Sequence, residues 1–198
     1  MAMRILGITG GMGMGKSTVA AVLGRMGIPV VDTDQIARNV VSPGEPALAE
    51  IRTAFGPEVF GEDGGLDRAA MARMVFGEPE ARRRLETILH PRIRERWMAW
   101  VKQGEQLGWK LAAVVIPLLY ETGAGGCFDR VVCVACTDVT QRRRLLARGW
   151  SLEEIEGRRQ AQWPVEQKMR ESDYVIWTEG REDLLETQLR HILASVLG

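Results

Sequence analysis

A glycine-rich segment near the N-terminus has the residue types and spacing needed to hold a chain of phosphates. It reads Gly-Gly-Met-Gly-Met-Gly-Lys-Ser from Gly10 to Ser17 and matches the pattern G-x-x-x-x-G-K-[ST]. Glycines let backbone N–H groups approach phosphate oxygens closely, and the N-terminus of a following helix adds a positive partial charge. We therefore expect the phosphates of a nucleotide to be bound by Gly10, Gly11, Met12, Gly13, Met14, Gly15, Lys16, Ser17 and Thr18.

Two side chains at the end of this segment supply a charge and a metal ligand. Lys16 is expected to reach the outer phosphates as a mobile positive charge, and the Ser17 hydroxyl is a suitable ligand for Mg²⁺. A glycine-rich turn can also be a purely structural start of a helix. Here a predicted strand precedes the motif and a predicted helix follows it, which favours a nucleotide-binding P-loop.

Two carboxylates, Asp32 and Asp34, follow the second predicted strand. In open parallel sheets, ligands bind beyond the carboxyl ends of the strands, so we expect both side chains to face the P-loop. Asp34 would position a substrate hydroxyl, and Asp32 would ligate a metal ion. Asp34 also has a structural alternative, because it directly precedes Gln35 and suits the N-cap of a helix that begins there.

The arginine-rich segment from Gln141 to Arg148 is predicted to be helical, with Arg144 and Arg148 one turn apart on one face. Planar guanidinium groups suit phosphate oxygens, and a mobile lid that carries them would stabilise the transferred charge and exclude water. The alternative is a solvated basic helix whose arginines pair with Glu153, Glu154 and Glu156.

Two other patterns carry no chemistry by themselves. Cys133 and Cys136 form a C-x-x-C sequence, but positions three apart in a strand point to opposite faces, and no second cysteine pair completes a zinc site. We expect buried structural thiols. His90 directly precedes Pro91, which predicts only the boundary of a helix.

Short apolar runs alternate with helical periods along the chain, which predicts an α/β fold with a parallel sheet covered on both faces. Residues 36–110 and 141–170 are predicted to be two mainly helical insertions. The predicted helices of the core are Lys16–Met26 and a closing helix from about Arg181. The five predicted strands are Arg4–Thr9, Pro29–Asp32, Leu111–Ile116, Arg130–Ala135 and Asp173–Trp177.

The amino-acid composition indicates which classes of binding partner this protein is not expected to have. The 198 residues include 26 Lys plus Arg and 26 Asp plus Glu, a balance that gives no general attraction to nucleic acid or to an anionic membrane. The longest uncharged apolar stretch, Leu111–Tyr120, is too short to span a bilayer. Three cysteines without a secretory signal favour a cytoplasmic protein with reduced thiols.

Together these motifs resemble the dephospho-coenzyme A kinase family over nearly the whole chain. The resemblance begins with the P-loop and the segment Val31–Asp34, followed by Ala37 and Arg38. It continues through Leu89-His-Pro91, Pro117-Leu-Leu-Tyr-Glu121, Asp129-Arg-Val-Val, Gln141-x-x-Arg144 and Gln162-Trp-Pro-x-Glu-x-Lys168.

The resemblance implies a single P-loop kinase domain of residues 1–198: a three-layer sandwich on a five-stranded parallel sheet. Its helical insertion would bind the acceptor, and its helical lid would carry arginines. It implies transfer of the γ-phosphoryl group of ATP, with Mg²⁺, to the ribose 3′-hydroxyl of dephospho-coenzyme A. Asp34 matches the proposed base of the family. The expected catalytic residues are Asp34, Lys16, Arg144 and Arg148, and the expected acceptor-binding residues are Asp34, His90, Pro117, Leu118 and Glu121.

One departure concerns the nucleotide base. The family usually reads V-I-D-N-x-G after its last strand, but this chain has Trp177 and Thr178 in place of Asp-Asn. Two alternatives remain open at this point: another nucleoside or small-molecule kinase, and a regulatory P-loop switch. A GTPase is disfavoured because no N-K-x-D is present. The oligomeric state, monomer or small homo-oligomer, is left open.

Overall fold

The computed structural model describes residues 2–75 and 78–198, and the chain divides into two compact units. The first contains the residues up to Asp32 and from Val101 onward, and the second is Thr33–Trp100. The long helix α5, Pro79–Gln106, begins in the second unit and ends in the first.

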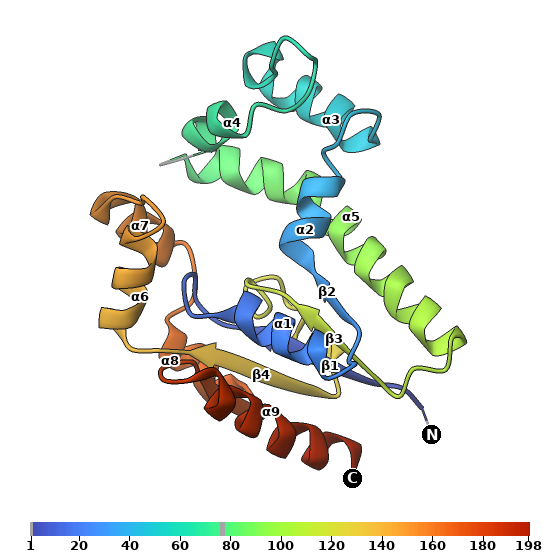
Figure 1. The fold of residues 1–198 in the computed structure, drawn as a ribbon. Helices are drawn as coiled ribbons and strands as arrows, with labels where there is room; N and C mark the ends of the chain where they lie inside the picture. Colours follow the sequence, from blue (N-terminus) through green and yellow to red (C-terminus); the bar gives the residue numbers. More distant parts are fainter. Residues whose placement is uncertain (1, 76–77) are drawn as a thin grey trace. The chain divides into compact units, whose positions relative to one another are not determined.

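The first unit is built on a five-stranded parallel sheet in the order β2-β3-β1-β4-β5 (Figure 1). Thr9 at the end of β1 lies opposite Cys133 of β4, and Ile8 lies opposite Val115 of β3. The carboxyl ends of the three central strands therefore share one edge, and the loops that follow them emerge together. The strands are β1 Arg4–Thr9, β2 Val30–Asp32, β3 Leu111–Val115, β4 Arg130–Ala135 and β5 Tyr174–Trp177.

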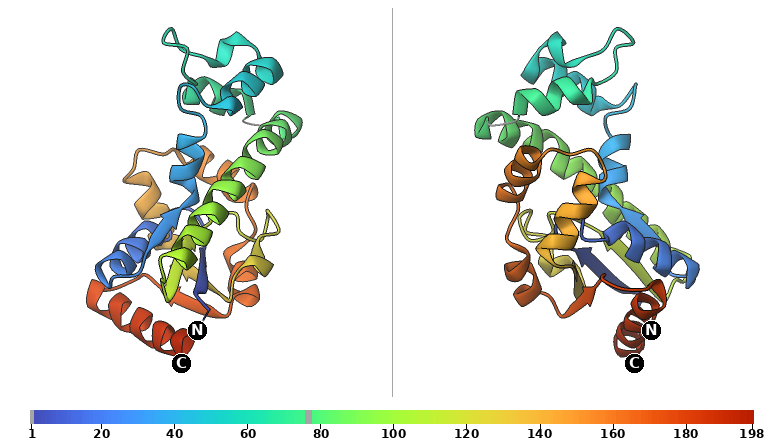
Figure 2. Two further views of the ribbon diagram at one scale, coloured as in Figure 1. Left: turned by 90° about the vertical axis from the view of Figure 1, so that its right-hand side faces the viewer. Right: turned by 60° about the vertical axis from the view of Figure 1, so that its left-hand side comes forward.

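Helices cover both faces of this sheet. α1 and α9 (blue and red in Figure 2) share one apolar core with alternate strand residues such as Val132 and Val134 of β4. Cys133 points to the opposite face, where α8 packs against β4. The helices of this unit are α1 Lys16–Arg25, α6 Asp138–Leu146, α7 Leu152–Gln160, α8 Val165–Glu171 and α9 Glu182–Leu197, with a short 3₁₀ turn at Gly125–Cys127.

The second unit is helical. Its apolar core includes Ile51, Phe55 and Val59, while ion pairs join α3 to α5 at its surface. Besides α5, its elements are α2 Thr33–Asn39, α3 Pro46–Phe55, a 3₁₀ turn at Pro57–Val59 and α4 Arg68–Val75.

The predicted helix boundary at His90 and Pro91 is wrong, because α5 continues through both residues. Proline removes a backbone donor and disturbs the carbonyl groups one turn before it. Close to the proline, Arg92 Nη1 donates a hydrogen bond of 2.6 Å to the carbonyl oxygen of Ile88. A single proline therefore does not end this long helix.

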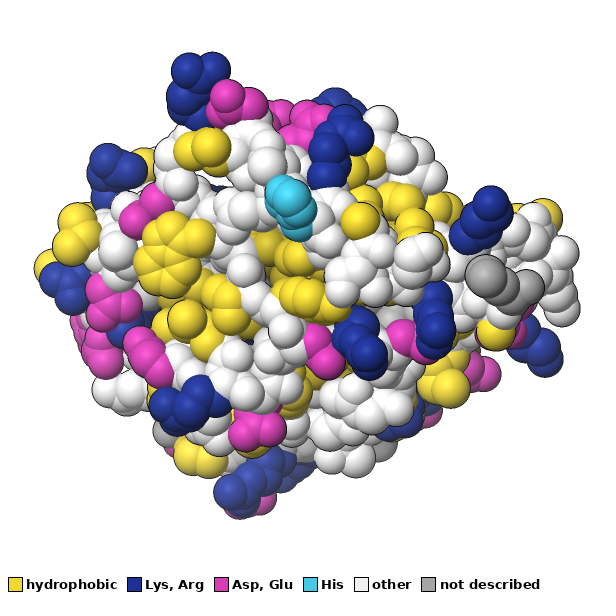
Figure 3. All heavy atoms as spheres, turned by 90° about the horizontal axis from the view of Figure 1, so that it is seen from below, with side chains coloured by type: hydrophobic (Ala, Val, Ile, Leu, Met, Phe, Trp, Pro, Cys, Tyr) yellow, Lys and Arg dark blue, Asp and Glu magenta, His cyan; other side chains and the backbone are white. Residues whose placement is uncertain are grey.

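The predicted five-stranded parallel sheet and the closing helix are confirmed. None of the described helices combines the length and the apolar character needed to cross a membrane. On the face shown in Figure 3, acidic and basic side chains lie interspersed, in keeping with their equal numbers in the sequence. The single-domain organisation and the roles of the two insertions stay predictions.

Candidate active site

The glycine-rich loop joins the central strand β1 to α1, at the middle of the carboxyl edge of the sheet. It begins at Gly10, whose backbone adopts φ +138°, a conformation that favours glycine. A Cβ atom at Gly10 would lie 2.2 Å from the carbonyl oxygen of Val134 in β4. Only a residue without a side chain lets the loop pass so close to the neighbouring strand, so this glycine fixes where the loop leaves the sheet.

Successive carbonyl oxygens of the loop are held by side chains from α6 and from the segment after β5. The side chains are an amide, a guanidinium group and a hydroxyl group, all contributed by residues far along the chain. Gln141 Nε2 donates to Met12 O (2.8 Å), Arg144 Nη1 to Gly13 O (3.5 Å) and Thr178 Oγ1 to Met14 O (2.7 Å).

These contacts determine which way the loop presents its amides. The carbonyl and the N–H of one planar trans peptide point in opposite directions. Since the carbonyls of Met12 and Met14 face the supporting side chains, the N–H groups of Gly13 and Gly15 point away from them. Converging N–H groups beside the N-terminus of α1 suit an anion. The loop therefore fits a chain of phosphates.

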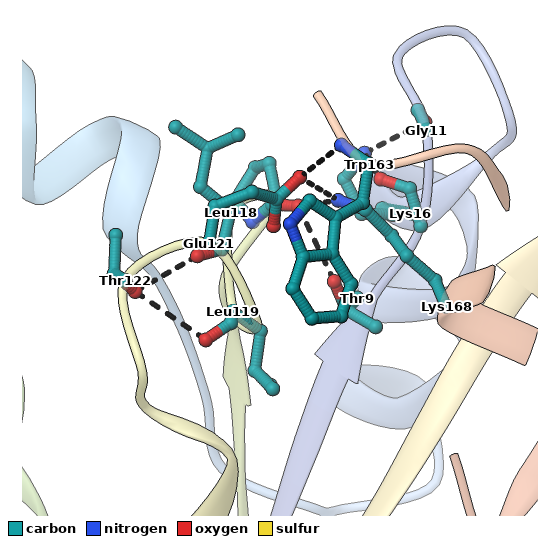
Figure 4. A network of polar contacts seen from close by, with 11 residues as sticks. Thr9, Gly11, Lys16, Leu118, Leu119, Glu121, Thr122, Trp163 and Lys168 are labelled. Carbon is teal, nitrogen blue, oxygen red and sulfur yellow. Dashed lines mark hydrogen bonds and ion pairs between the residues drawn. The ribbon is translucent and has the colours of Figure 1, made fainter. Parts of the chain in front are cut away.

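The cationic side chain of the loop lies over its first residues. Lys16 Nζ donates to the carbonyl oxygens of Gly10 (2.8 Å) and Gly11 (2.9 Å), and Figure 4 labels Lys16 and Gly11. Ser17 and Thr18 are exposed in the first turn of α1. The ammonium group thus stays at the loop, where a bound phosphate would meet it.

The oxygen atoms predicted to hold a metal ion come from separate elements. The Ser17 hydroxyl belongs to the first turn of α1, and Asp32 is the half-buried last residue of β2. Among residues 2–75 and 78–198, no three His, Cys, Asp or Glu side chains form a group that could hold a metal by themselves. Mg²⁺ is usually held by one or two protein oxygens together with substrate phosphates and water, which this donor set fits.

Arg144 and Arg148 have different surroundings, although the sequence predicted one helical face for both. Arg144 is half-buried and donates to Thr178 through Nη1 to Oγ1 (2.9 Å) and through Nη2 to the carbonyl oxygen (2.7 Å). Arg148 is exposed in a turn beyond α6, which ends at Leu146. Arg144 thus stabilises the P-loop through its contacts with Gly13 and Thr178, while Arg148 is exposed to solvent.

The prediction that the helix continues through Arg148 is therefore wrong. The N–H groups of Gly149 and Trp150 bond to the carbonyls of Leu146 (2.9 Å) and Leu145 (3.3 Å), the pattern of a Schellman motif. Gly149 has φ +83°, the left-handed conformation that closes such a motif. The glycine ends α6 at Leu146, two residues before Arg148.

Asp34 and His90 belong to the second unit. α2 begins at Thr33, so Asp34 lies inside its first turn, exposed and close to the positive end of the helix. An N-cap residue precedes the first helical residue, so the alternative that Asp34 is an N-cap is wrong. His90 is half-buried in the middle of α5. The catalytic and acceptor-binding roles of both residues stay predictions.

The turn after β3 places Pro117, Leu118 and Glu121 at the same sheet edge as the P-loop. Figure 4 labels Leu118 and Glu121 in this turn. The carbonyl oxygen of Leu118 accepts from Thr122 Oγ1 (2.8 Å), so the turn is locally closed. Glu121 Oε1 forms an ion pair with the Nζ of Lys168 (2.8 Å). The acceptor-binding role of this turn stays a prediction.

The two cysteines of the C-x-x-C sequence are buried at the end of β4. Burial raises the pKa of Cys133 to about 11, although Lys168 and Lys16 partly oppose it. Burial also raises the pKa of Cys136. Only the thiolate is a good nucleophile or metal ligand, so neither side chain is suited to these roles near neutral pH.

Glu179 joins the ends of β4 and β5. Its Oε1 accepts a hydrogen bond from the backbone N–H of Thr137 (2.9 Å) and one from the Thr137 hydroxyl, and its Oε2 accepts from Trp177 Nε1 (3.2 Å). Hydrogen bonds from the side chains of Thr137 and Thr140 lower the pKa of Glu179 to about 2. The carboxylate therefore stays ionised and holds the start of α6, which carries Gln141 and Arg144.

Sequence reasoning missed the supporting roles of several residues. Thr178 stood out as a departure from the family pattern, yet its hydroxyl donates to the P-loop and accepts from Arg144. Lys168 and Trp163 lay in a quoted motif but had no assigned role. A lysine or tryptophan within a short helical segment carries no periodic signal that would place it in a site.

Comparisons with known proteins agree with this geometry. A model of the dephospho-CoA kinase family matches residues 4–183. The chain belongs to that family. A dephospho-CoA kinase of Bdellovibrio bacteriovorus is 43% identical over 96% of this chain and 95% of the relative. One of Anaeromyxobacter dehalogenans is 44% identical over 99% of this chain and 93% of the relative.

Structure comparison finds a solved structure that matches over the whole length of this chain. A crystal structure of a Thermus thermophilus protein superposes with a TM-score of 0.86 at 38% identity, covering 100% of both chains. The predicted family, the P-loop α/β fold class and the predicted activity, that of a dephospho-CoA kinase, are confirmed.

Proposed function

We propose that the protein transfers the γ-phosphoryl group of ATP to the ribose 3′-hydroxyl of dephospho-coenzyme A. The single observation that carries this proposal is the P-loop, whose carbonyls are held by Gln141, Arg144 and Thr178 so that N–H groups of the loop point away from these side chains. Membership of the dephospho-CoA kinase family supports the choice of acceptor.

The donor site uses charge and fixed amides. The loop amides bind the phosphates of ATP, and Lys16 neutralises the outer ones. Ser17 and Asp32 would hold Mg²⁺, which would neutralise negative charge on the phosphates of ATP. Phosphoryl transfer passes through a loose transition state, so positioning and charge neutralisation supply most of the catalysis.

The proposed acceptor-binding residues come from several elements. Asp34 orients the 3′-hydroxyl and accepts its proton late in the transfer, while His90, Pro117, Leu118 and Glu121 hold the rest of the acceptor. An exposed carboxylate in the first turn of a helix is suited to accept a hydroxyl hydrogen bond.

The two arginines have separate tasks. Arg144 keeps the P-loop in its binding conformation through Thr178 and Gly13. Arg148, exposed in the turn after α6, is the residue of the pair that closes over the transferred phosphoryl group. Buried, protonated thiols at Cys133 and Cys136 are in keeping with work in the cytoplasm, where cysteines remain reduced.

Coupled measurement of ADP release with a panel of acceptors tests the proposal. The panel contains dephospho-coenzyme A, adenosine, shikimate and a sugar, with Mg²⁺ present or chelated. We expect rapid ADP release only with dephospho-coenzyme A and Mg²⁺, and a product phosphorylated at the 3′ position by ³¹P NMR. Preference for another acceptor would refute the proposed substrate. Slow hydrolysis that no acceptor stimulates would favour a nucleotide switch.

A further inference from the structure

A fully buried lysine lies beside the turn after β3. The side chain of Lys168, in α8, is 0% exposed. Its Nζ donates to the carbonyl oxygen of Pro117 (2.7 Å) and pairs with Glu121 Oε1 (2.8 Å). Lysine is almost never fully buried unless its charge is paired. Lys168 therefore binds both ends of the turn from Pro117 to Glu121 with one ammonium group (Figure 4).

Further contacts join the same turn to the segment that begins with Trp163. The backbone N–H of Trp163 donates to Glu121 Oε1 (2.8 Å). The rings of Tyr120 and Trp163 stack with centroids 5.7 Å apart and an interplanar angle of 9°. The hydroxyls of Tyr120 and Ser172 are hydrogen-bonded at 2.9 Å. The turn is thus fixed along its length to residues 163–172.

The network also reaches the start of the P-loop. The carbonyl oxygen of Pro117, which accepts from Lys168, accepts a second hydrogen bond from Thr9 Oγ1 (3.3 Å). Thr9 is the residue directly before the loop. One carbonyl oxygen therefore links β1, the turn after β3 and α8 at the sheet edge where the proposed chemistry occurs.

Glu121 has one oxygen atom available for a ligand. Its Oε2 is buried, and no hydrogen-bond partner within the described part of the chain reaches it. A buried carboxylate oxygen without a donor is costly, and it is satisfied by a neutral donor such as a hydroxyl or an amide N–H of a ligand. Lys168 and Trp163 occupy the other oxygen and so orient Oε2.

We propose that Lys168 is a positioning residue for acceptor binding, acting through Glu121 and the turn from Pro117 to Glu121. It orients Glu121 Oε2 toward a hydroxyl or amide N–H of the acceptor and keeps the turn in one conformation beside the P-loop. This inference rests on the proposed function, which assigns the turn to the acceptor.

A purely structural pair makes a different prediction. In that case Lys168 only neutralises the buried Glu121 carboxylate, and removing both charges together would restore stability and activity alike. If the pair positions the acceptor, removing both charges restores stability but not acceptor binding. Stability and the acceptor KM are therefore separable readouts.

The experiment compares Lys168→Met, Glu121→Gln and the double variant with the wild type. Melting temperature, kcat, the KM for dephospho-coenzyme A and the Kd for ATP are measured well below the lowest melting temperature. Leu189→Ala is the matched control, because it opens a cavity in the core beside α9 and lowers stability without touching the network.

We expect Lys168→Met to lower kcat/KM for the acceptor by about tenfold to a hundredfold, the scale of a small misplacement of bound groups. The Kd for ATP should change by less than about threefold, well short of that loss. The double variant should regain most of the melting temperature of the wild type but keep the low kcat/KM. Leu189→Ala should lose melting temperature and keep the acceptor KM.

Several outcomes would overturn the inference. A folded Lys168→Met with the wild-type acceptor KM would do so, as would a double variant that regains both stability and kcat/KM. If Lys168→Met does not fold, Glu121→Gln decides: it places an NH₂ group at the position of Oε2, so an unchanged acceptor KM would contradict the proposal. A wild type that releases no ADP with dephospho-coenzyme A would instead refute the proposed function, and this inference with it.

Discussion

The P-loop is stabilised by one kind of contact, and the helical unit Thr33–Trp100 is stabilised by another. The loop is bound at consecutive backbone carbonyls by side chains from α6 and the segment after β5. In the helical unit, exposed or half-exposed ion pairs join α5 to α3 and to the N-cap residue of α3: Arg92 with Glu50 and Arg96 with Glu45. Contacts to backbone atoms determine local geometry, whereas solvated ion pairs contribute little free energy. Changes around the loop should therefore alter catalytic rates, and changes at these pairs should alter stability slightly.

The largest effect is expected at Lys16. Lys16→Ala removes the positive charge beside the phosphates, so we expect turnover to be nearly abolished while the fold remains intact. Measurement of acceptor-dependent ADP release, together with circular dichroism, checks both statements. Lys102→Ala, at an exposed position of α5, serves as the control and should keep wild-type turnover. Wild-type ADP release by a folded Lys16→Ala would contradict the role of the loop.

Substitution of Asp34 tests whether the helical unit supplies a residue that takes part in phosphoryl transfer. Asn keeps the shape of the side chain but cannot take a proton, so Asp34→Asn should lower kcat by about 10²–10⁴-fold, the usual contribution of a general base. The Kd for ATP should stay nearly unchanged. Steady-state kinetics and ATP titration provide both numbers.

Asp32→Asn is the matched comparison for Asp34. Asp32 ends β2 in the first unit, so its substitution should mainly raise the Mg²⁺ concentration needed for half-maximal activity. If Asp34→Asn keeps kcat within about threefold of the wild type, far short of a general-base effect, Asp34 has no place in the mechanism.

The two arginines are expected to differ. Arg144→Ala breaks charged hydrogen bonds to Thr178, so it should weaken ATP binding by about tenfold or more and lower the melting temperature. Arg148→Ala should lower kcat and leave the melting temperature unchanged, because Arg148 is exposed. ATP titration, kcat and thermal unfolding distinguish the two patterns, and equal effects of both variants would contradict the separate roles.

The different surroundings of the two arginines also show which features of the site can be predicted from the sequence and which cannot. The P-loop could be predicted because its residues from Gly10 to Ser17 are contiguous and their types follow from the chemistry. The strands could be predicted because parallel sheets bury continuous apolar runs. The contact between Thr178 and Met14 could not, because it joins residues 164 positions apart through a hydroxyl group that fits many environments.

The features that the sequence predicted wrongly, or did not predict, each depend on a contact in one part of the structure. The end of α6 depends on Gly149 closing a Schellman motif, which outweighs the helical spacing of the arginines. α5 continues through Pro91, so the preference of the residue before a proline for extended backbone is overridden inside this long helix. The buried pair of Lys168 and Glu121 arises from the packing of α8 on the sheet, which no pattern in a short segment reveals.

The stability of the protein at acidic pH tests the contribution of Glu179, which lies in the first unit. Hydrogen bonds lower the pKa of Glu179 from 4.5 to about 2, so between these pH values the unfolded chain takes up a proton that the folded chain does not. The stabilising effect is complete above pH 4.5 and is lost as the pH falls towards 2. As the pH falls from 4.5 towards 2, the melting temperature of Glu179→Gln should therefore decrease less steeply than that of the wild type. Melting curves between pH 7 and 2.5 test this, with Glu105→Gln as an exposed control.

The smallest effect is expected at the surface of the helical unit. Glu45→Gln removes the charge that pairs with Arg96 (2.6 Å), and such partly exposed pairs contribute about 1 kcal/mol or less. We expect a change of unfolding free energy within that range, and a difference from the wild type that shrinks as salt rises from 0.05 to about 0.5 M, because salt screens exposed charges. Hydrogen exchange of α3 and α5, compared with urea unfolding of the whole chain, checks whether the loss stays in this unit. A loss of several kcal/mol, or one insensitive to salt, would mean that the pair fixes geometry as the P-loop contacts do. The proposed distinction between the two regions would then be wrong.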